Sequence, residues 1–319
     1  MSVASGLEHL KPFLPGLESA LEDPEVSEIM INGPGNVWVE RAGRLTSHDA
    51  PRLDEAALLR AAIHIARPLG LDPASSPVVD ARLDDGSRVA ICVPPASPTV
   101  AITVRRFGTR AFSAGDLVAQ GALPEEVLRQ ATQVLQSRRN ILVSGGTGSG
   151  KTTLLNALIE LLPEDERIVA IEDTLELRIE RPNCVRFEAR GLQEGAVTIR
   201  DLVRHALRHR PDHIVVGEVR GGEAADLLQA LNTGHGGSLT TVHANNAESA
   251  LSRIASCAMQ GGGALPWEVT CRGVVDGIRM VIHMTRREGR RFVEEAAFVE
   301  GYQAGENRWD VQRIVERQA

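Results

Sequence analysis

The stretch 141–153 constrains what this chain can fold into more than any other. It begins with a short apolar run, passes through glycines and small residues, and enters a helical pattern. The pattern G-x-x-x-x-G-K-[ST] is filled by Gly145, Gly150, Lys151 and Thr152. Glycines let successive backbone N–H groups turn inward, and the helix that follows adds the positive end of its dipole. The stretch therefore predicts a strand, a phosphate-binding loop and a helix.

The loop predicts nucleotide binding rather than a glycine-rich turn that binds nothing, because a helical apolar pattern follows it directly. We expect Lys151 to reach the β- and γ-phosphates and the Thr152 hydroxyl to complete the coordination of Mg²⁺. Among 35 basic residues only Lys11 and Lys151 are lysine, and a compact ammonium suits a cavity built from backbone amides. The expected nucleotide-binding residues of the loop are Gly145, Gly146, Thr147, Gly148, Ser149, Gly150, Lys151, Thr152 and Thr153.

Length and charge limit the other possibilities. A chain of 319 residues with 43% hydrophobic and 24% charged residues is typical of a globular protein with two domains. The net charge of −7 and the pI near 5.8 argue against a nucleic-acid surface as the main function, because such surfaces are usually basic. Any contact with DNA is expected to be indirect or weak.

The sequence also predicts a cytoplasmic location. No apolar run approaches the roughly 18 residues that cross a bilayer, and residues 1–20 lack the layout of a secretory signal. The four cysteines, Cys92, Cys184, Cys257 and Cys271, form no C-x-x-C pair. Such cysteines suit a reducing compartment and are expected to be packing residues.

The first part of the chain, residues 1–107, predicts a compact α+β domain. Turn chemistry indicates hairpins at 29–40 and 78–93, a helix at 54–66 capped by Asp54, and a further strand at 100–106. The polar, glycine-punctuated segment 108–122 predicts a linker.

Residues 123–319 predict an α/β domain. Helical patterns at 125–137, 199–208 and 223–231 alternate with strand patterns at 168–171, 214–216 and 238–242. Strand-like segments at 280–284 and 292–299 follow. Alternation of this kind is typical of a parallel sheet with crossover helices.

Acidic residues follow two of these strands. Glu218 comes after the apolar run 214–216, and Glu172 and Asp173 come after 168–171. Because carboxyl ends of parallel strands meet at the ligand-binding edge of an α/β sheet, both sets are candidate active-site groups. Glu218 is placed to align or polarise the attacking water. Phosphate-loop proteins usually carry Asp where this chain has Gly217-Glu218, which weakens the case for a direct carboxylate–Mg²⁺ bond there.

Histidines form two further candidate groups. His235 and His243 flank glycine-rich and threonine-rich stretches, and structural and functional roles both remain open for them. His205, His209 and His213 are four apart, and His205 and His209 have metal-ligand spacing on one helical face, but no acidic residue lies between them in the H-E-x-x-H manner, so a metal site is disfavoured. The neighbouring Arg200, Arg204 and Arg208 lie opposite an apolar stripe, which predicts a solvated or subunit-facing surface.

Four ordered motifs together resemble the type II/IV secretion ATPase superfamily, and within it the conjugative-transfer TrbB-type branch of type IV secretion systems. Residues 145–152 match its Walker A loop, and Ile171-Glu172-Asp173 with Glu176 matches its Asp box. Residues 210–220 match its Walker B segment, and 233–244 match its His box. A looser match covers 29–43 and 80–106.

The resemblance implies a RecA-like P-loop ATPase domain at 123–319 and a smaller, PAS-like α+β domain at 1–107. It implies a hexameric motor that uses ATP and Mg²⁺, lies in the cytoplasm at the inner membrane and works with inner-membrane components of the secretion machinery. Such a motor powers assembly of a channel or pilus and substrate transfer.

The resemblance also assigns roles to residues. Glu218 is the implied catalytic base, Glu172 helps to arrange Mg²⁺ or water, and His243 is a further catalytic candidate. Arg105 and Arg106, at the end of the last N-domain strand, are implied γ-phosphate contacts, with Arg186 a weaker candidate.

Three alternatives remain open on the sequence. A Flp/Tad-type pilus motor or type II secretion motor is the nearest one, although those chains usually carry longer N-terminal extensions. A regulatory nucleotide-binding subunit would assemble without turnover. A small-molecule kinase is the third, but no acceptor pocket or lid is readable.

Overall fold

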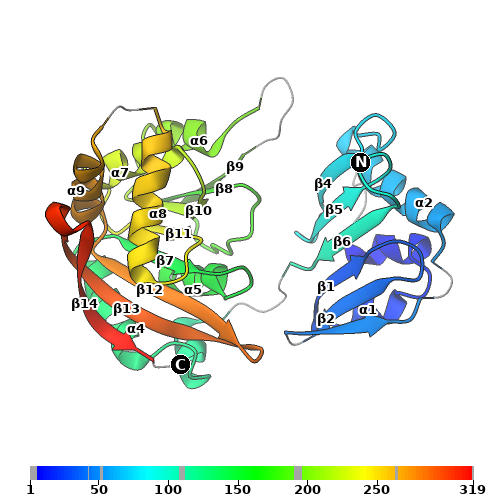
Figure 1. Cartoon of the computed structure of the whole chain (residues 1–319), viewed down its shortest axis with the longest axis horizontal. Coiled ribbons are helices and arrows are strands. Elements are labelled where there is room, and N and C mark those ends of the chain that lie inside the picture. Colours follow the sequence, from blue (N-terminus) through cyan, green and yellow to red (C-terminus); the bar gives the residue numbers. More distant parts are fainter. Residues whose placement is uncertain are drawn as a thin grey trace. The chain divides into compact units, whose positions relative to one another are not determined.

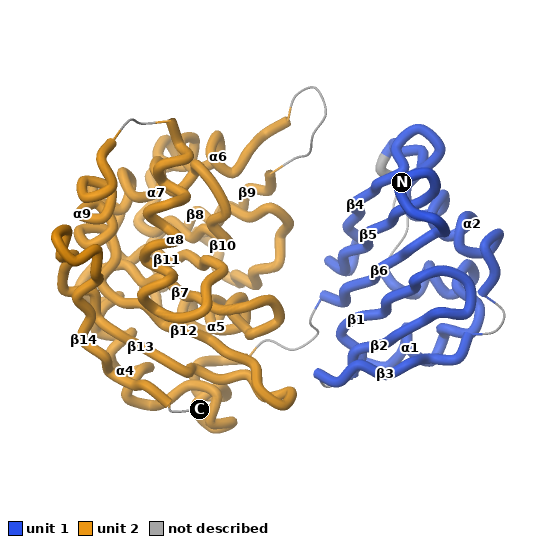
Figure 2. The backbone as a smooth tube through the Cα atoms, in the orientation of Figure 1, with its two compact units in different colours: residues 1–110 blue, residues 111–319 orange. Residues whose placement is uncertain are grey.

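The computed structural model describes residues 6–41, 43–50, 53–107, 112–189, 196–262 and 265–317. It divides the chain into two compact units, Met1–Arg110 and Ala111–Ala319 (Figure 2). Of the expected linker, residues 108–111 lie outside the described residues. The rest contains helix α3 (Ala114–Ala119), which begins with a Ser113–Asp116 capping box and packs Leu117 into the core of unit 2. This part of the segment therefore belongs to unit 2.

Unit 1 is an antiparallel sheet with helices packed on one face. Its strands are β1 (Val26–Ile31), β2 (Val37–Arg41), β3 (Arg44–His48), β4 (Val78–Arg82), β5 (Arg88–Cys92) and β6 (Ala101–Arg105), in the spatial order β3-β2-β1-β6-β5-β4. The helical elements are η1 (Leu7–Phe13), α1 (Glu18–Glu22), α2 (Glu55–Ala66) and η2 (Arg67–Leu69). Both expected hairpins are confirmed, and Asp54 accepts the N–H of Ala57 as the cap of α2.

Alternation along the strands of unit 1 explains how the sheet buries one face. In β6, Ile102 and Val104 are buried in the same core as Leu58 of α2, whereas Arg105 is exposed. Because side chains of a strand alternate between faces, one face of the sheet is apolar and covered. The opposite face carries charged residues such as Glu28 and Arg105, together with exposed apolar ones such as Trp38.

Unit 2 is built around a mixed eight-stranded sheet within the described residues, in the order β14-β13-β12-β7-β11-β10-β8-β9 (Figure 1). The six strands from β12 to β9 are parallel, β13 pairs antiparallel with β12, and β14 pairs antiparallel with β13. The strands are β7 (Ile141–Gly145), β8 (Ile168–Glu172), β9 (Cys184–Glu188), β10 (His213–Val219), β11 (Leu239–Val242), β12 (Met280–Arg287), β13 (Arg290–Gln303) and β14 (Arg308–Glu316).

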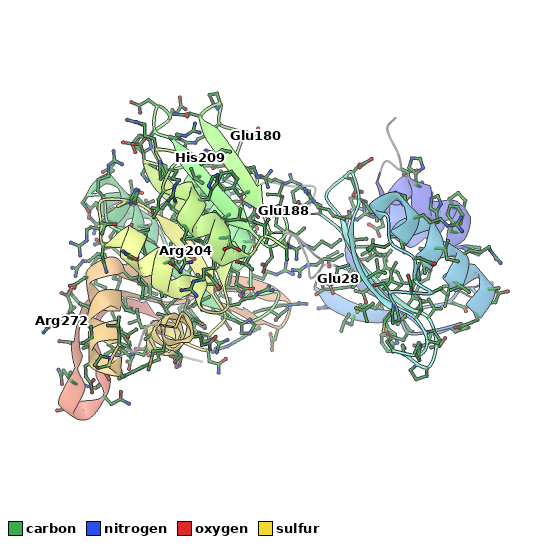
Figure 3. The ribbon with its side chains drawn as sticks, turned by 90° about the horizontal axis from the view of Figure 1, so that it is seen from above. Glu28, Glu180, Glu188, Arg204, His209 and Arg272 are labelled. Atoms are coloured by element: carbon green, nitrogen blue, oxygen red, sulfur yellow. The ribbon has the colours of Figure 1, made fainter. Side chains whose placement is uncertain are left out.

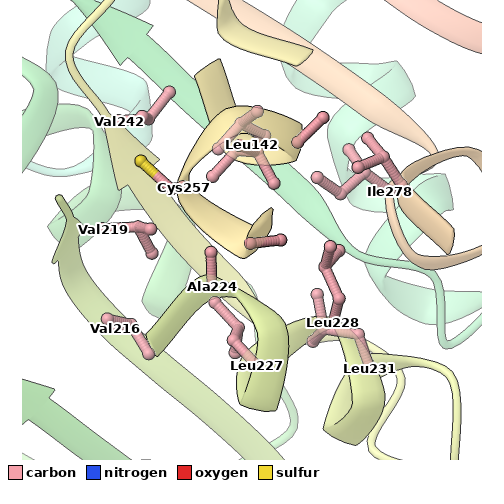
Figure 4. Close-up of a cluster of buried hydrophobic side chains, with 14 of the residues drawn as sticks. Leu142, Val216, Val219, Ala224, Leu227, Leu228, Leu231, Val242, Cys257 and Ile278 are labelled. Carbon is pink, nitrogen blue, oxygen red and sulfur yellow. The ribbon is translucent and has the colours of Figure 1, made fainter. Parts of the chain in front are cut away.

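Helices cover both faces of this sheet, which is the reason that its central strands are apolar on both sides. One core joins the sheet to α6 (Ile199–Ala206), α7 (Glu223–Leu231), α8 (Ala247–Gln260) and α9 (Trp267–Gly277). The other joins it to α3, α4 (Glu125–Gln136) and α5 (Lys151–Ile159). In β7, Leu142 faces the first core and Ile141 and Val143 face the second. Figure 4 shows Leu142 with residues of α7 and with Cys257 of α8.

Several elements were not expected from the sequence. The helices α8 and α9 and the strands β9 and β14 had no prediction, and η3 (Ala304–Glu306) precedes β14. Strand β10 continues to Val219, so Gly217 and Glu218 lie within it rather than after it. Among the described residues, none of the helices has both the length and the apolar character needed to span a membrane.

Candidate active site

The phosphate loop joins β7 to α5 at the point where the order of the strands reverses. Residue 145 must be glycine, because its φ is 153° and a Cβ there would lie 2.3 Å from the Met284 carbonyl oxygen. Gly150 caps α5 in the left-handed conformation, with φ of 99°. The two glycines thus bend the loop tightly onto the start of α5. The ligand-binding crevice of an open α/β sheet lies at such a reversal.

The polar groups of the loop fit a phosphate. The Lys151 ammonium folds back and donates to the carbonyl oxygens of Gly145 and Gly146, each at 3.1 Å. The Ser149 hydroxyl is buried, and its oxygen has no hydrogen-bond partner within the described part of the chain. A buried hydroxyl without a protein partner in a loop of this kind fits a contact to a bound phosphate. Thr152 and Thr153 lie half-buried in the first turn of α5.

A bulge in β10 places Glu218. Val216 pairs with Thr240 of β11 and Val219 pairs with Val242, so two residues of β10 lie opposite Thr241 alone. The Thr241 hydroxyl donates to the Gly217 carbonyl at 2.6 Å and fixes the bulge. Bulges of this type re-aim a side chain at the end of a strand.

Glu218 lies between two cations. Its Oε1 is 3.5 Å from Lys151 Nζ, and its Oε2 is 2.6 Å from Arg220 Nη2. Burial opposes ionisation, but the neighbouring Arg220 and Lys151 outweigh it, so the pKa of Glu218 falls below its ordinary value. The Glu218 carboxylate is therefore ionised at neutral pH and faces the phosphate loop.

Glu172, at the end of β8, is held very differently. Its Oε1 accepts the backbone N–H groups of Glu176 and Leu177 at 2.7 and 2.8 Å, and its Oε2 accepts Arg186 Nη2 at 3.1 Å. Only 3% of Glu172 is exposed, and this burial raises its pKa despite those contacts. Both oxygens are occupied by groups of the protein, so in this arrangement Glu172 pins the 173–177 turn, and binding Mg²⁺ would require Arg186 to leave.

The glycine at 217 has a structural reason that the sequence did not reveal. A Cβ at this position would lie 3.1 Å from Glu172 Cγ on the neighbouring strand. The missing side chain leaves room for the buried carboxylate. The glycine at 217, where the usual Asp is absent, is therefore explained by the buried Glu172 beside it.

The His box is divided between the two ends of β11. His235 lies at the amino end and its Nδ1 bonds to the Ala230 carbonyl at 3.1 Å. His243 follows the carboxyl end, where the candidate site lies, and is exposed. The structure thus brings His243 to the same edge of the sheet as Glu218 and leaves His235 at the other edge.

The second histidine group does not form a metal centre in the described residues. The rings of His205 and His209 contact each other through Nε2 at 3.1 Å and pack on Phe187. His213 is buried in β10 and bonds to the Gly237 carbonyl and to Glu166.

The arginines near these histidines are partly tied down rather than simply solvated. Arg200 and Arg204 of α6 both bind Asp226 of α7, at 2.6 and 2.7 Å. Figure 3 labels Arg204 among the side chains of unit 2. Arg200 also donates to the Gly261 carbonyl. The two arginines therefore link α6 to α7.

In unit 1, the two candidate arginines have different surroundings. The Arg106 guanidinium donates to backbone carbonyls, with Nη2 2.6 Å from Leu21 O and Nε 3.0 Å from Val26 O. Arg105 is 48% exposed and pairs with Glu28 at 3.4 Å. Arg88 lies directly opposite Arg105 in the register of β5 and β6, which the sequence did not single out. Cross-strand register, rather than sequence adjacency, identifies residues on the same face.

Three more arginines reach the site in unit 2 and were not predicted as site residues. Arg220 binds both Glu218 and Asp173. Arg291 of β13 donates from Nε to the Gly148 carbonyl at 2.8 Å, and Arg286 of β12 also approaches Gly148. The sequence Gly217-Glu218-Val219-Arg220 already placed Arg220 close to Glu218. In contrast, Arg286 and Arg291 reach the phosphate loop only because β12 pairs with β7 and brings the β12–β13 hairpin to it.

Comparison with known proteins agrees with this geometry. The family described as type II/IV secretion system protein matches residues 16–296. This chain belongs to that family. A Mycobacterium tuberculosis protein named for conjugal transfer is 37% identical over 296 residues, which cover 88% of this chain and 83% of the relative. The conjugal transfer protein TrbB of Rhizobium radiobacter is 34% identical over 289 residues, covering 89% and 86%.

Solved structures of the type II/IV secretion family give the same result. The VirB11 ATPase of the Brucella suis type IV secretion system, in complex with sulphate, is 30% identical with a TM-score of 0.51 and covers 92% of this chain and 95% of its own. The Legionella pneumophila ATPase DotB is 25% identical with a TM-score of 0.64, covering 88% and 79%. The predicted family and fold class, a RecA-like P-loop domain with a smaller α+β domain, are confirmed.

Proposed function

We propose that this chain is the ATP-hydrolysing motor of a type IV secretion or conjugative-transfer system. The observation that carries the proposal is the phosphate loop with Lys151 Nζ 3.5 Å from the Glu218 carboxylate, since this places a phosphate-binding cation and an acceptor for the attacking water side by side. Relatives named for conjugal transfer and for type IV secretion support the system to which the motor belongs.

The residues of unit 2 divide the work between binding and hydrolysis. The loop amides, Ser149 and Lys151 bind the phosphates, and Lys151 leaves the Gly145 and Gly146 carbonyls to do so. Mg²⁺, held by Thr152 and the nucleotide, would neutralise charge on the β- and γ-phosphates. Glu218 orients the attacking water and accepts its proton. His243, at the same sheet edge, is available as a further polar contact.

Glu172 is proposed to act mainly through the turn that it pins. Arg186, which neutralises it, keeps a buried Nε donor that lacks a partner among the described residues. This donor makes Arg186, which lies on β9, a candidate contact for a bound phosphate. The alternative is that Glu172 binds Mg²⁺ directly, which requires the ion pair between Glu172 and Arg186 to open.

For the γ-phosphate contact from unit 1, the structure favours Arg105 over Arg106. The Arg106 guanidinium is engaged by backbone carbonyls, whereas Arg105 is half-exposed and pairs with the Glu28 carboxylate. A guanidinium that binds ATP but not ADP would release unit 1 after hydrolysis, and this difference would be the stroke of the motor. Assembly as a homohexamer in the cytoplasm, peripheral to the inner membrane and in contact with inner-membrane components, is part of the same proposal.

The central experiment is phosphate release by the purified chain and by Lys151→Ala. We expect steady turnover in the wild type and none in Lys151→Ala, with unchanged thermal unfolding because the loop lies outside both cores. Turnover at the wild-type rate in the variant would contradict the site. A wild type that binds ATP without turnover would instead indicate a regulatory nucleotide-binding subunit.

A second experiment separates the two arginines. Arg105→Ala should keep ADP affinity within about threefold, roughly 0.7 kcal/mol, and weaken ATP affinity much more. Arg106→Ala should lower the thermal stability of unit 1 and change both affinities equally. Equal losses for both nucleotides in Arg105→Ala would move the γ-phosphate contact to another residue.

A further inference from the structure

Arg220 stands outside the roles assigned so far, yet it makes the shortest ionic contact at the candidate site. It lies one residue after β10 and grips Glu218 Oε2 with two nitrogens, Nε at 2.7 Å and Nη2 at 2.6 Å. Its remaining Nη1 is 3.1 Å from Asp173 Oδ2, which follows β8. One guanidinium therefore bridges carboxylates from two neighbouring strands, a geometry that a planar fork allows and an ammonium does not.

The backbone of Arg220 is fixed although its side chain is exposed. Its N–H and that of Gly221 both donate to Glu223 Oε1, at 2.6 and 2.8 Å. A Cβ on Gly222 would lie 2.9 Å from the Gly261 Cα, so the turn after β10 packs closely on the end of α8. The side chain is 64% exposed, so its two carboxylate partners, rather than packing, determine where it lies.

The bridge determines which oxygen of Glu218 is available to a substrate. Because Arg220 holds Oε2, the carboxylate is turned so that Oε1 faces Lys151 and the phosphate loop. A glutamate in a strand bulge with one-fifth of its surface exposed would otherwise rotate about its terminal torsion, which is broad. Catalysis is sensitive to such rotation, since misplacing a catalytic group by about 1 Å can cost about 10²-fold.

We propose that Arg220 is the positioning residue of the catalytic glutamate: it anchors Glu218 Oε2 to Asp173 so that Oε1 receives the proton of the attacking water. The inference rests on the proposed ATPase function and assigns to Arg220 an effect on turnover that acts through Glu218. It requires no contact between Arg220 and the nucleotide.

The test is a double-mutant cycle on the full chain with ATP and Mg²⁺. Arg220→Gln should lower kcat by roughly 10-fold to 100-fold and leave the KM for ATP within about threefold. Arg220→Lys should recover part of the loss, because an ammonium can still pair with Glu218 but cannot bridge to Asp173. On a Glu218→Gln background, Arg220→Gln should lower kcat by less than about twofold, since the group that it positions is gone.

The matched control is Arg204→Gln. Arg204 is also an exposed arginine bound to a carboxylate, 2.7 Å from Asp226, but it lies on α6 and its partner is neither Glu218 nor Asp173. We expect its kcat to stay within about twofold of the wild type, as for a surface ion pair of little energetic weight. Thermal unfolding of each variant reports its folding, and Arg220→Lys replaces Arg220→Gln in the cycle if the latter fails to fold.

The outcomes separate the inference from the function on which it rests. Multiplicative losses in the double variant, or a KM for ATP raised along with a lowered kcat, would overturn the positioning role, the second result by indicating a nucleotide contact. Absence of phosphate release from the wild type would instead refute the ATPase proposal itself. Normal turnover in Arg220→Gln, with Lys151→Ala inactive, would refute the inference and leave the ATPase intact.

Discussion

Two neighbouring strands of one sheet, β8 and β10, carry glutamates at or next to their carboxyl ends, in opposite environments. Glu172 is buried and receives two backbone N–H groups and one guanidinium, whereas Glu218 is partly exposed and lies between two cations. Burial raises the pKa of the first, and the cations lower the pKa of the second in spite of burial. The difference shows that a carboxylate at this edge of the sheet has one of two roles. It either holds the backbone of a neighbouring turn, as Glu172 does, or remains available to a substrate, as Glu218 does, depending on which groups bond to its oxygens.

The strongest test of this difference is Glu218→Gln. The change removes the proton acceptor and keeps the shape, so we expect kcat to fall by about 10²-fold or more while ATP affinity is retained. Single-turnover hydrolysis and equilibrium binding of ATP measure the two quantities. A loss of ATP binding with a normal rate at saturation would make Glu218 a binding residue, and the base would then have to lie elsewhere.

Glu172→Ala should act on stability where Glu218→Ala does not. It removes the acceptor of the backbone N–H groups of Glu176 and Leu177. Each buried donor left without an acceptor lowers the free energy of unfolding by about 1–3 kcal/mol. Because removing a desolvated carboxylate offsets part of this, we expect a net loss of about 2 kcal/mol in the free energy of unfolding. Urea denaturation of the two alanine variants, compared under identical conditions, measures it. Equal losses in both would erase the contrast between the two strand ends.

Arg186→Gln addresses the same turn from the other side and should have a smaller effect. It removes the cation that neutralises Glu172 but leaves both backbone N–H bonds, so we expect a loss of about 1 kcal/mol in the free energy of unfolding. Urea denaturation is again the measurement, and a parallel ATP titration reports any phosphate contact. Unchanged stability combined with weaker ATP binding would show that Arg186 serves the nucleotide more than Glu172.

The smallest predicted effect is a pair of opposite pH dependences. The folded pKa of Glu172 lies above the ordinary value of 4.5, so the folded state binds more protons and stability falls as pH rises from 4.5 through that pKa. The folded pKa of Glu218 lies below 4.5, so its contribution is present above 4.5 and is lost as pH falls through that pKa.

Unfolding free energies of Glu172→Gln and Glu218→Gln between about pH 3.5 and pH 7 test the two signs. Relative to the wild type, Glu172→Gln should become more stable as pH rises above 4.5, and Glu218→Gln should lose less stability than the wild type on acidification below 4.5. Slopes of the same sign in both variants would show that the two carboxylates share one environment.

The local patterns that predicted well are those whose cause is itself local. The cap at Asp54, the hairpins of unit 1 and the helix 223–231 follow from turn chemistry and from periodicity, and the structure reproduces them. The patterns that failed need distant partners. The helices α8 and α9 had no prediction, and each packs its apolar face against α7 and the sheet through contacts that no local pattern specifies.

The sequence by itself determined the phosphate loop, the family and the order of the motifs, because glycine geometry and a lysine at a fixed spacing act within a dozen residues. Only the tertiary structure decided how the charged groups are used. It leaves Arg105 about half-exposed and engages the Arg106 guanidinium with backbone carbonyls. It also lets Gly217 make room for Glu172, and it joins Glu218 to Asp173 through Arg220. Except for the pairing of Arg220 with Glu218, these contacts join segments far apart in the sequence, and they arise only when the sheets assemble.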